Sequence, residues 1–150
     1  MPNLIWPLDK VFITQGFGMR PEYYARYKLK GHNGIDLRVR FMDSPLGRRY
    51  VVAAADGSAY AVRADAHGYG THIRLKHPDG SVTIYGHLTR SYVSQGASVK
   101  AGERIGLTGN TGDSSAAHLH FEYRPPGWEN NIDNGYAGAV DPMPFIYPDH

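Results

Sequence analysis

The sequence predicts an all-β domain, because turn-forming and strand-forming residues are both abundant and no stretch carries a long helical pattern. Its 150 residues include 18 glycines, 10 prolines and 11 tyrosines. Glycine and proline favour turns, whereas tyrosine is enriched in strands. The length suits one hydrophobic core, so we expect a single domain over residues 1–150.

Alternating or β-branched runs, separated by glycine or proline, indicate where the strands lie. Before the middle of the chain, strands are expected at residues 11–14, 35–39, 50–55 and 59–64. Closely spaced glycines from Gly96 onward indicate short strands joined by tight corners. The end of the chain is rich in proline, glycine and asparagine, so we expect it to be mostly loop.

The clearest hairpin is predicted by residues 71–77 and 81–88, which alternate and flank the turn sequence Pro-Asp-Gly. A two-residue turn would place His72 opposite Tyr85. Alternation would place Tyr85 and His87 on the polar face of the second arm. Its apolar face would then carry Val82, Ile84 and Leu88. One apolar and one polar face are typical of a half-buried sheet with a working surface.

Charge and cysteine content exclude several kinds of function. The formal net charge is +2, far below the dense Lys/Arg footprint of a nucleic-acid binder. The chain has no cysteine, so a metal would have to be bound by carboxylates and some of its 8 histidines. No segment has the apolar length to cross a membrane, and the first residues lack the pattern of a signal peptide. We expect neither nucleic-acid binding nor membrane insertion.

The segment Gly-His-Asn-Gly-Ile-Asp-Leu contains the first candidate metal ligands. In an extended chain His32, Gly34 and Asp36 point the same way, and the missing side chain of Gly34 would leave space for an ion. Gly34 and the β-branched Ile35 disfavour a helix here. Taken alone, this segment is explained equally well by a surface histidine that lies near an aspartate by chance.

The segment Ala-His-Leu-His-Phe-Glu-Tyr contains the second set of candidates. Two-residue spacing places His118 and His120 on one side of a strand, with the apolar residues on the other. Burying two imidazoles for packing alone would require partners for four ring nitrogens, so a functional role is favoured. Glu122 shares their side and is interpreted as an ion-pairing or supporting group. His87, in Tyr-Gly-His-Leu, would by itself be interpreted as a solvated residue. It becomes a candidate functional residue only because the other two segments also carry histidines.

The three motifs HNGID, YGHL and HLHFE, in this order, resemble the lysostaphin-like or LytM-like zinc endopeptidases of bacterial cell-wall metabolism and phage lysis. The resemblance covers nearly the whole chain, including most of its glycines. It implies a compact antiparallel β core with an active-site groove and long loops. It also implies one Zn²⁺ per chain, held by His32, Asp36 and His120, with His87 and His118 beside an open coordination position.

The resemblance implies a reaction in which histidines handle the protons. Because there is no HExxH glutamate, His87 and His118 would activate water and stabilise or protonate the tetrahedral intermediate, and the sequence leaves their division of roles open. Tyr85 and His72 are further candidates for the groove wall, although an ordinary strand aromatic explains Tyr85 more simply. The other histidines are expected at the surface: His67, His77 and His150.

The expected function is therefore hydrolysis of cross-links or stem peptides of peptidoglycan by a monomeric zinc endopeptidase. The site of action would be the cell wall, in the periplasm or outside the cell. Because the first residues lack a signal peptide, we expect either a phage or prophage lysis enzyme, released by a holin or a virion, or a trimmed catalytic domain. The sequence is equally compatible with both. The alternative is a non-enzymatic wall-binding or activator protein with the same fold. A lipoyl-type carrier would not explain the histidines. The bond cleaved, a glycine bridge or a link from D-alanine to a diamino acid, stays open.

Overall fold

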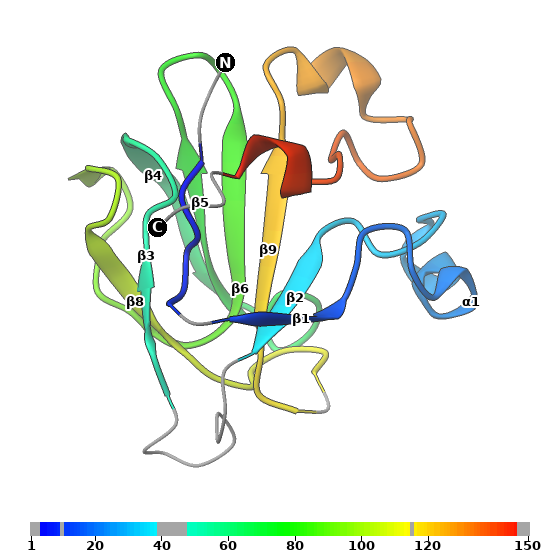
Figure 1. The fold of residues 1–150 in the computed structure, drawn as a ribbon, viewed down its shortest axis with the longest axis horizontal. Coiled ribbons are helices and arrows are strands. Elements are labelled where there is room, and N and C mark those ends of the chain that lie inside the picture. The colour runs from blue at the N-terminus through cyan, green and yellow to red at the C-terminus, as the bar shows by residue number, and fades with distance from the viewer. Residues whose placement is uncertain (1–3, 10, 39–47, 115, 147–150) are drawn as a thin grey trace.

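The chain forms a single antiparallel sheet that curves around a core, which confirms the predicted all-β fold. The structure, a computed structural model, describes residues 4–9, 11–38, 48–114 and 116–146. The main path of the sheet runs in the order β1-β2-β9-β6-β5-β4-β7. β3 pairs with β8, which also pairs with β6, and these two strands lie on the side of the sheet away from α1 (Figure 1).

The strands follow the sequence pattern closely, and the helices are short. The strands are β1 (Phe12–Gln15), β2 (Ile35–Arg38), β3 (Tyr50–Val52), β4 (Gly57–Ala64), β5 (Thr71–Lys76), β6 (Val82–Ser91), β7 (Ser98–Val99), β8 (Arg104–Thr108) and β9 (Leu119–Arg124). The helical turns are α1 (Pro21–Tyr24), η1 (Ala25–Tyr27), η3 (Trp128–Asn131) and η4 (Met143–Phe145). The predicted strand at 35–39 ends at Arg38, and residue 39 lies outside the described residues.

Alternate residues of β2 and β9 build the centre of the core, as the sequence predicts. The inward side chains are fully buried: Ile35, Leu37, Leu119, Phe121 and Tyr123. The two strands are directly paired, with Ile35 opposite Phe121 and Leu37 opposite Leu119. Burial of about five large apolar side chains contributes on the order of 10 kcal/mol, which is enough to hold this pairing in one register.

The hairpin of β5 and β6 has a register one residue away from the predicted one. The turn contains three residues, the His77 N–H donates to the Ser81 carbonyl at 2.9 Å, and Gly80 has a φ of 89°. Consequently Ile73 lies opposite Tyr85, and both side chains are fully buried in the core. A slip of one residue exchanges the faces of a strand, so the prediction that Tyr85 belongs to the polar face is wrong.

A β-bulge in β6 then turns His87 away from the core. β5 advances two residues, from Thr71 to Ile73, while β6 advances three, from Tyr85 to Leu88. Tyr85 and Leu88 are therefore both buried in the core, which simple alternation would forbid. His87 sits at the extra position with a φ of 62°, a left-handed conformation that non-glycine residues rarely adopt.

A chain of buried polar groups explains why the core accepts a tyrosine at position 85. The Ala54 N–H donates to the Tyr85 hydroxyl at 2.9 Å, and this hydroxyl lies 2.7 Å from Thr83 Oγ1. Thr83 Oγ1 is in turn 2.8 Å from His77 Nε2. His77 is 5% exposed, so its predicted surface position is wrong.

Removal of the Tyr85 hydroxyl should destabilise the fold. In Tyr85→Phe the buried Ala54 N–H loses its acceptor, and the expected loss in the free energy of unfolding is about 1–3 kcal/mol. Urea denaturation measures this loss. Tyr92→Phe, at a tyrosine that is 43% exposed, is the control and should change stability by less than about 0.5 kcal/mol. Equal stability of the two variants would contradict the core position of Tyr85.

Candidate metal centre

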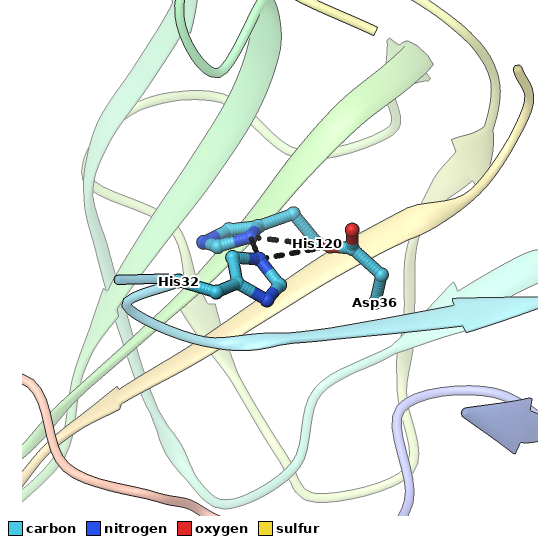
Figure 2. A group of neighbouring side chains, drawn as sticks. All are labelled: His32, Asp36 and His120. Carbon is cyan, nitrogen blue, oxygen red and sulfur yellow. Dashed lines mark hydrogen bonds and ion pairs between the residues drawn. The ribbon is translucent and has the colours of Figure 1, made fainter. Parts of the chain in front are cut away.

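Three side chains from two paired strands and the preceding turn converge on one point. Asp36 on β2 lies directly opposite His120 on β9, and His32 stands in the turn before β2. Figure 2 shows the three side chains pointing toward one another. His32 Nε2 lies 3.1 Å from Asp36 Oδ1 and 3.1 Å from His120 Nδ1, and His120 Nδ1 lies 3.5 Å from Asp36 Oδ1. All three residues are buried.

Each of these three side chains has one polar atom that points away from the other two, here called its outer atom. Each outer atom contacts a polar group elsewhere in the protein. His32 Nδ1 is 3.2 Å from the Gly16 carbonyl oxygen, and the His32 ring stacks on Tyr24 with centroids 5.0 Å apart. Asp36 Oδ2 accepts a hydrogen bond from Gln15 Nε2 at 3.2 Å. His120 Nε2 lies 3.2 Å from the Glu122 carboxylate. The three remaining atoms, His32 Nε2, Asp36 Oδ1 and His120 Nδ1, are therefore directed at one another.

This donor set fits a divalent metal. Asp36 Oδ1 is buried, and in the described part of the chain no donor bonds it in hydrogen-bond geometry. Two imidazole nitrogens and a carboxylate oxygen, all within 4.8 Å of one another, are the residue types that hold zinc in catalytic sites. Three protein ligands leave a coordination position open. The sequence-predicted ligands are thus brought together in an arrangement that could bind a metal.

Gly34 has a different role from the predicted one. A Cβ at this position would lie 2.5 Å from the Phe121 carbonyl oxygen and 2.8 Å from His120 Cε1. The sequence predicts that the missing side chain leaves room for an ion. The structure shows that the room is taken by the His120 imidazole and by the backbone of β9.

His87 and His118 lie side by side next to the three converging residues. Their ring centroids are 4.6 Å apart, and His118 Nε2 is 3.5 Å from Asp36 Oδ1. His87 Nδ1 lies 2.7 Å from the Thr111 carbonyl oxygen, and His118 Nδ1 lies 2.8 Å from that of Ala116. A carbonyl oxygen only accepts hydrogen bonds, so each Nδ1 carries its proton. In the neutral rings Nε2 is then the basic nitrogen.

Burial and neighbouring charge set the protonation states of the centre. Burial, reinforced by the nearby His118 and His120 rings, lowers the pKa of His87 to about 3, so His87 is neutral near pH 7. Although burial opposes its charge, the nearby Asp36 and Glu122 carboxylates raise the pKa of His120 to about 9. Against the same effect of burial, close contacts with the His120 and His32 imidazoles hold the pKa of Asp36 far below its usual value. Asp36 is therefore an anion at neutral pH, as a metal ligand must be.

The two predicted groove residues do not line a groove. Tyr85 is fully buried in the core, on the other face of the sheet. His72 is also fully buried, with Nδ1 3.0 Å from the Gly70 carbonyl oxygen and Nε2 accepting from Arg74 Nε at 3.2 Å. Both interpretations are corrected, because neither side chain can reach a substrate. His67 is at the surface as predicted, and His150 lies outside the described residues.

Sequence reasoning missed several residues that contact the ligands or their supports, among them Gln15 and Tyr69. Gln15 donates to Asp36, and the Tyr69 hydroxyl donates to Glu122. Neither residue stands in a recognisable local pattern with a histidine, so no signal in the sequence could have found it. Of the helices in the described residues, none is long and apolar enough to cross a membrane.

The comparisons with known proteins point to one family of peptidases. The model of peptidase family M23 matches residues 30–134, a span that contains all five histidine and aspartate residues of the centre. An uncharacterized metalloprotease of Haemophilus influenzae is 40% identical over 119 residues, which are 79% of this chain and 24% of that protein. The peptidoglycan DD-endopeptidase ShyB of Vibrio cholerae is 33% identical over 119 residues, which are 78% of this chain and 26% of that protein. The chain thus spans about a quarter of these two relatives.

A solved structure supports the same fold. The catalytic domain of the antimicrobial peptidase lysostaphin from Staphylococcus simulans superimposes with a TM-score of 0.62. Its sequence is 33% identical, and the match covers 77% of this chain and 79% of that domain. This similarity confirms the lysostaphin-like fold that the sequence motifs predict.

A side chain at position 34 should disrupt the centre. In Gly34→Ala the new Cβ would collide with β9 and the His120 ring, so we expect a loss of about 1–3 kcal/mol in unfolding free energy and weaker metal binding. Denaturation and metal titration measure these effects. Gly16→Ala is the matched control, because within the described residues its Cβ would meet only Met19 Cγ, at 3.8 Å. Equal behaviour of both variants would contradict the close packing described for Gly34.

Burial of neutral His87 should make the metal-free protein sensitive to acid. The pKa of about 3 in the folded state lies below the unfolded value near 6.5, so the unfolded state binds more protons between these values. The resulting stabilisation is complete above pH 6.5 and is lost as the pH falls toward 3, by up to about 1.4 kcal/mol per pH unit. Denaturation at pH 7, 6 and 5 should show a shallower slope for His87→Gln. The control is His67→Gln, which replaces a histidine whose side chain is 90% exposed.

Proposed function

Because the chain belongs to peptidase family M23, we propose that it is a zinc-dependent endopeptidase that hydrolyses peptides of bacterial peptidoglycan. The observation that carries the proposal is the convergence of His32, Asp36 and His120 on one point. Two further histidines, His87 and His118, lie side by side next to them. The relative from Vibrio cholerae, which is named a peptidoglycan DD-endopeptidase, supports the substrate class.

The proposed ligands are His32 Nε2, Asp36 Oδ1 and His120 Nδ1. A zinc ion held there would supply a Lewis acid for the scissile carbonyl and a bound water with a pKa near 7. The backbone and Glu122 hold the outer nitrogens of the two histidines, so both rings are oriented before a metal binds. Orientation in advance lowers the cost of assembling the site.

His118 is proposed to accept the proton of the attacking water. Its Nε2 is basic in the neutral ring and lies 3.5 Å from Asp36 Oδ1, so it stands directly beside the ligands. The same nitrogen, once protonated, can give the proton to the leaving amine. His87 is kept neutral by burial, and its ring centroid lies 4.6 Å from that of His118 and 6.1 Å from that of His120. We assign it to holding water or substrate at the site.

A wall-binding or activator protein without activity is the second candidate. Such a protein would have no need of a complete ligand set, yet here all three ligand atoms converge and both flanking histidines are present. The enzyme is therefore favoured. We further propose that the protein acts on the cell wall as a monomer.

Fragment analysis tests the proposed activity and the bond cleaved. The purified protein is incubated with walls cross-linked by glycine bridges and with walls cross-linked directly from D-alanine to a diamino acid, and the products are identified by mass spectrometry. We expect new peptide termini from one wall type, loss of the products after zinc chelation, and recovery with added Zn²⁺. If the zinc-loaded protein releases no peptide from either wall, the endopeptidase proposal is wrong.

Substitution of His118 should separate catalysis from metal binding. His118→Ala removes the proposed base, and the expected loss in kcat is about 10²- to 10⁴-fold with zinc content unchanged. The matched control is His67→Ala, at a histidine whose side chain is 90% exposed, which should keep full activity. Normal wall cleavage by His118→Ala would refute the assigned role, whereas loss of zinc would reassign His118 as a ligand.

A further inference from the structure

The proposed mechanism does not use Glu122, although it is a buried carboxylate next to the metal centre. Glu122 on β9 is fully buried, two residues after His120 and on the same face of the strand. A buried carboxylate without partners costs several kcal/mol of folding free energy. Its neighbours Phe121 and Tyr123 fill the core from the other face, so packing does not require an acid here.

Four side chains satisfy this carboxylate. Its Oε2 accepts from Arg124 Nε at 2.7 Å. Its Oε1 accepts from Asn33 Nδ2 at 3.0 Å and from the Tyr69 hydroxyl, and it lies 3.2 Å from His120 Nε2. These partners come from β9, from the turn that carries His32 and from the turn before β5. The orientation of Glu122 is therefore determined by three separate parts of the chain.

The contact between Glu122 and His120 decides which nitrogen of His120 faces the other ligands. An ionised carboxylate only accepts hydrogen bonds, so the proton on this side belongs to Nε2. The lone pair of the neutral ring is then on Nδ1, the atom that lies 3.1 Å from His32 Nε2 and 3.5 Å from Asp36 Oδ1. Without this acceptor, the ring could carry its proton on Nδ1 and present no lone pair to a metal.

His120 differs in this respect from the other three histidines of the centre. The outer nitrogens of His32, His87 and His118 all lie against backbone carbonyl oxygens, those of Gly16, Thr111 and Ala116. Only His120 has a carboxylate in that place. A carboxylate orients an imidazole and also makes it a stronger electron donor to a metal, which a neutral carbonyl does less well.

We propose that Glu122 is a positioning residue for the metal ligand His120. It holds the Nε2–H tautomer and strengthens the Nδ1 donor, while Asn33, Tyr69 and Arg124 hold Glu122 in place. The backbone of Tyr69 also contacts that of His87, because the backbone N–H of His87 donates to the Tyr69 carbonyl oxygen at 2.7 Å. This inference rests on the proposed zinc site and adds a role for a residue outside the ligand set.

The test is a measurement of zinc affinity in Glu122→Gln. Glutamine keeps the size and one acceptor oxygen but removes the charge, and we expect a 10- to 100-fold weaker zinc affinity in competition with a chromophoric chelator. The Co²⁺-substituted variant should show a shifted d–d absorption spectrum, since the donor strength of one ligand changes. Glu129→Gln, at an exposed glutamate on η3, is the matched control and should equal the wild type.

The outcomes separate this inference from the proposed function. Wild-type protein that binds no zinc would refute the zinc site itself. Wild-type binding together with equal affinity and an unchanged Co²⁺ spectrum in a folded Glu122→Gln would refute only the positioning role. If Glu122→Gln does not fold, zinc affinity is measured in Tyr69→Phe instead. This variant removes one hydrogen bond to the Glu122 carboxylate and leaves the charge of Glu122 in place. We expect a 2- to 10-fold loss of zinc affinity there, and unchanged affinity would overturn the proposal.

Discussion

The antiparallel pairing of β2 with β9 is the constraint on which the rest of this structure depends. It places Asp36 directly opposite His120, and it does so because the flanking pairs, Ile35 with Phe121 and Leu37 with Leu119, are buried on the other face. A shift of one residue would expose those apolar side chains and bury the polar ones, at a cost of many kcal/mol. The same pairing register thus builds the apolar core on one face of the sheet and the candidate metal centre on the other.

Around that pairing, the protein satisfies every outer atom of the centre and leaves the inner atoms facing one another. Backbone carbonyls hold three of the histidines, and Gln15 and Glu122 hold Asp36 and His120. In a buried site an unmatched polar atom is costly, so the unmatched Oδ1 of Asp36 is a place where a cation could bind. Without a cation, the buried Oδ1 lowers the folding free energy that the protein gains, and functional sites commonly contain such unfavourable groups.

The region around Tyr85 and His87 shows where alternation along a strand stops being a reliable guide. Local pattern places both residues on one face, but a three-residue turn and a bulge place Tyr85 in the core and His87 in the site. Neither feature has a strong signature, because the Pro-Asp-Gly turn accommodates two registers and His87 is not a glycine. The sequence also fails to predict that His72 and His77 are buried. Burial of a histidine depends on whether acceptors lie against its ring nitrogens, and here they are the carbonyl oxygens of Gly70 and Asp56.

The sequence alone determined the fold class, most of the strands and which residues are the candidate metal ligands, because alternation, glycine spacing and the three histidine motifs are local features. It also placed His118 next to the candidate ligands, although His118 lies just before β9, at an isolated bridge to Gly109, and not inside the strand as predicted. Only the tertiary structure decided which nitrogen of each ring faces inward, that Gly34 makes room for the His120 imidazole, and that Glu122 is held by Asn33, Tyr69 and Arg124. These are contacts between segments far apart in the chain, and their geometry is set by the packing of the sheet.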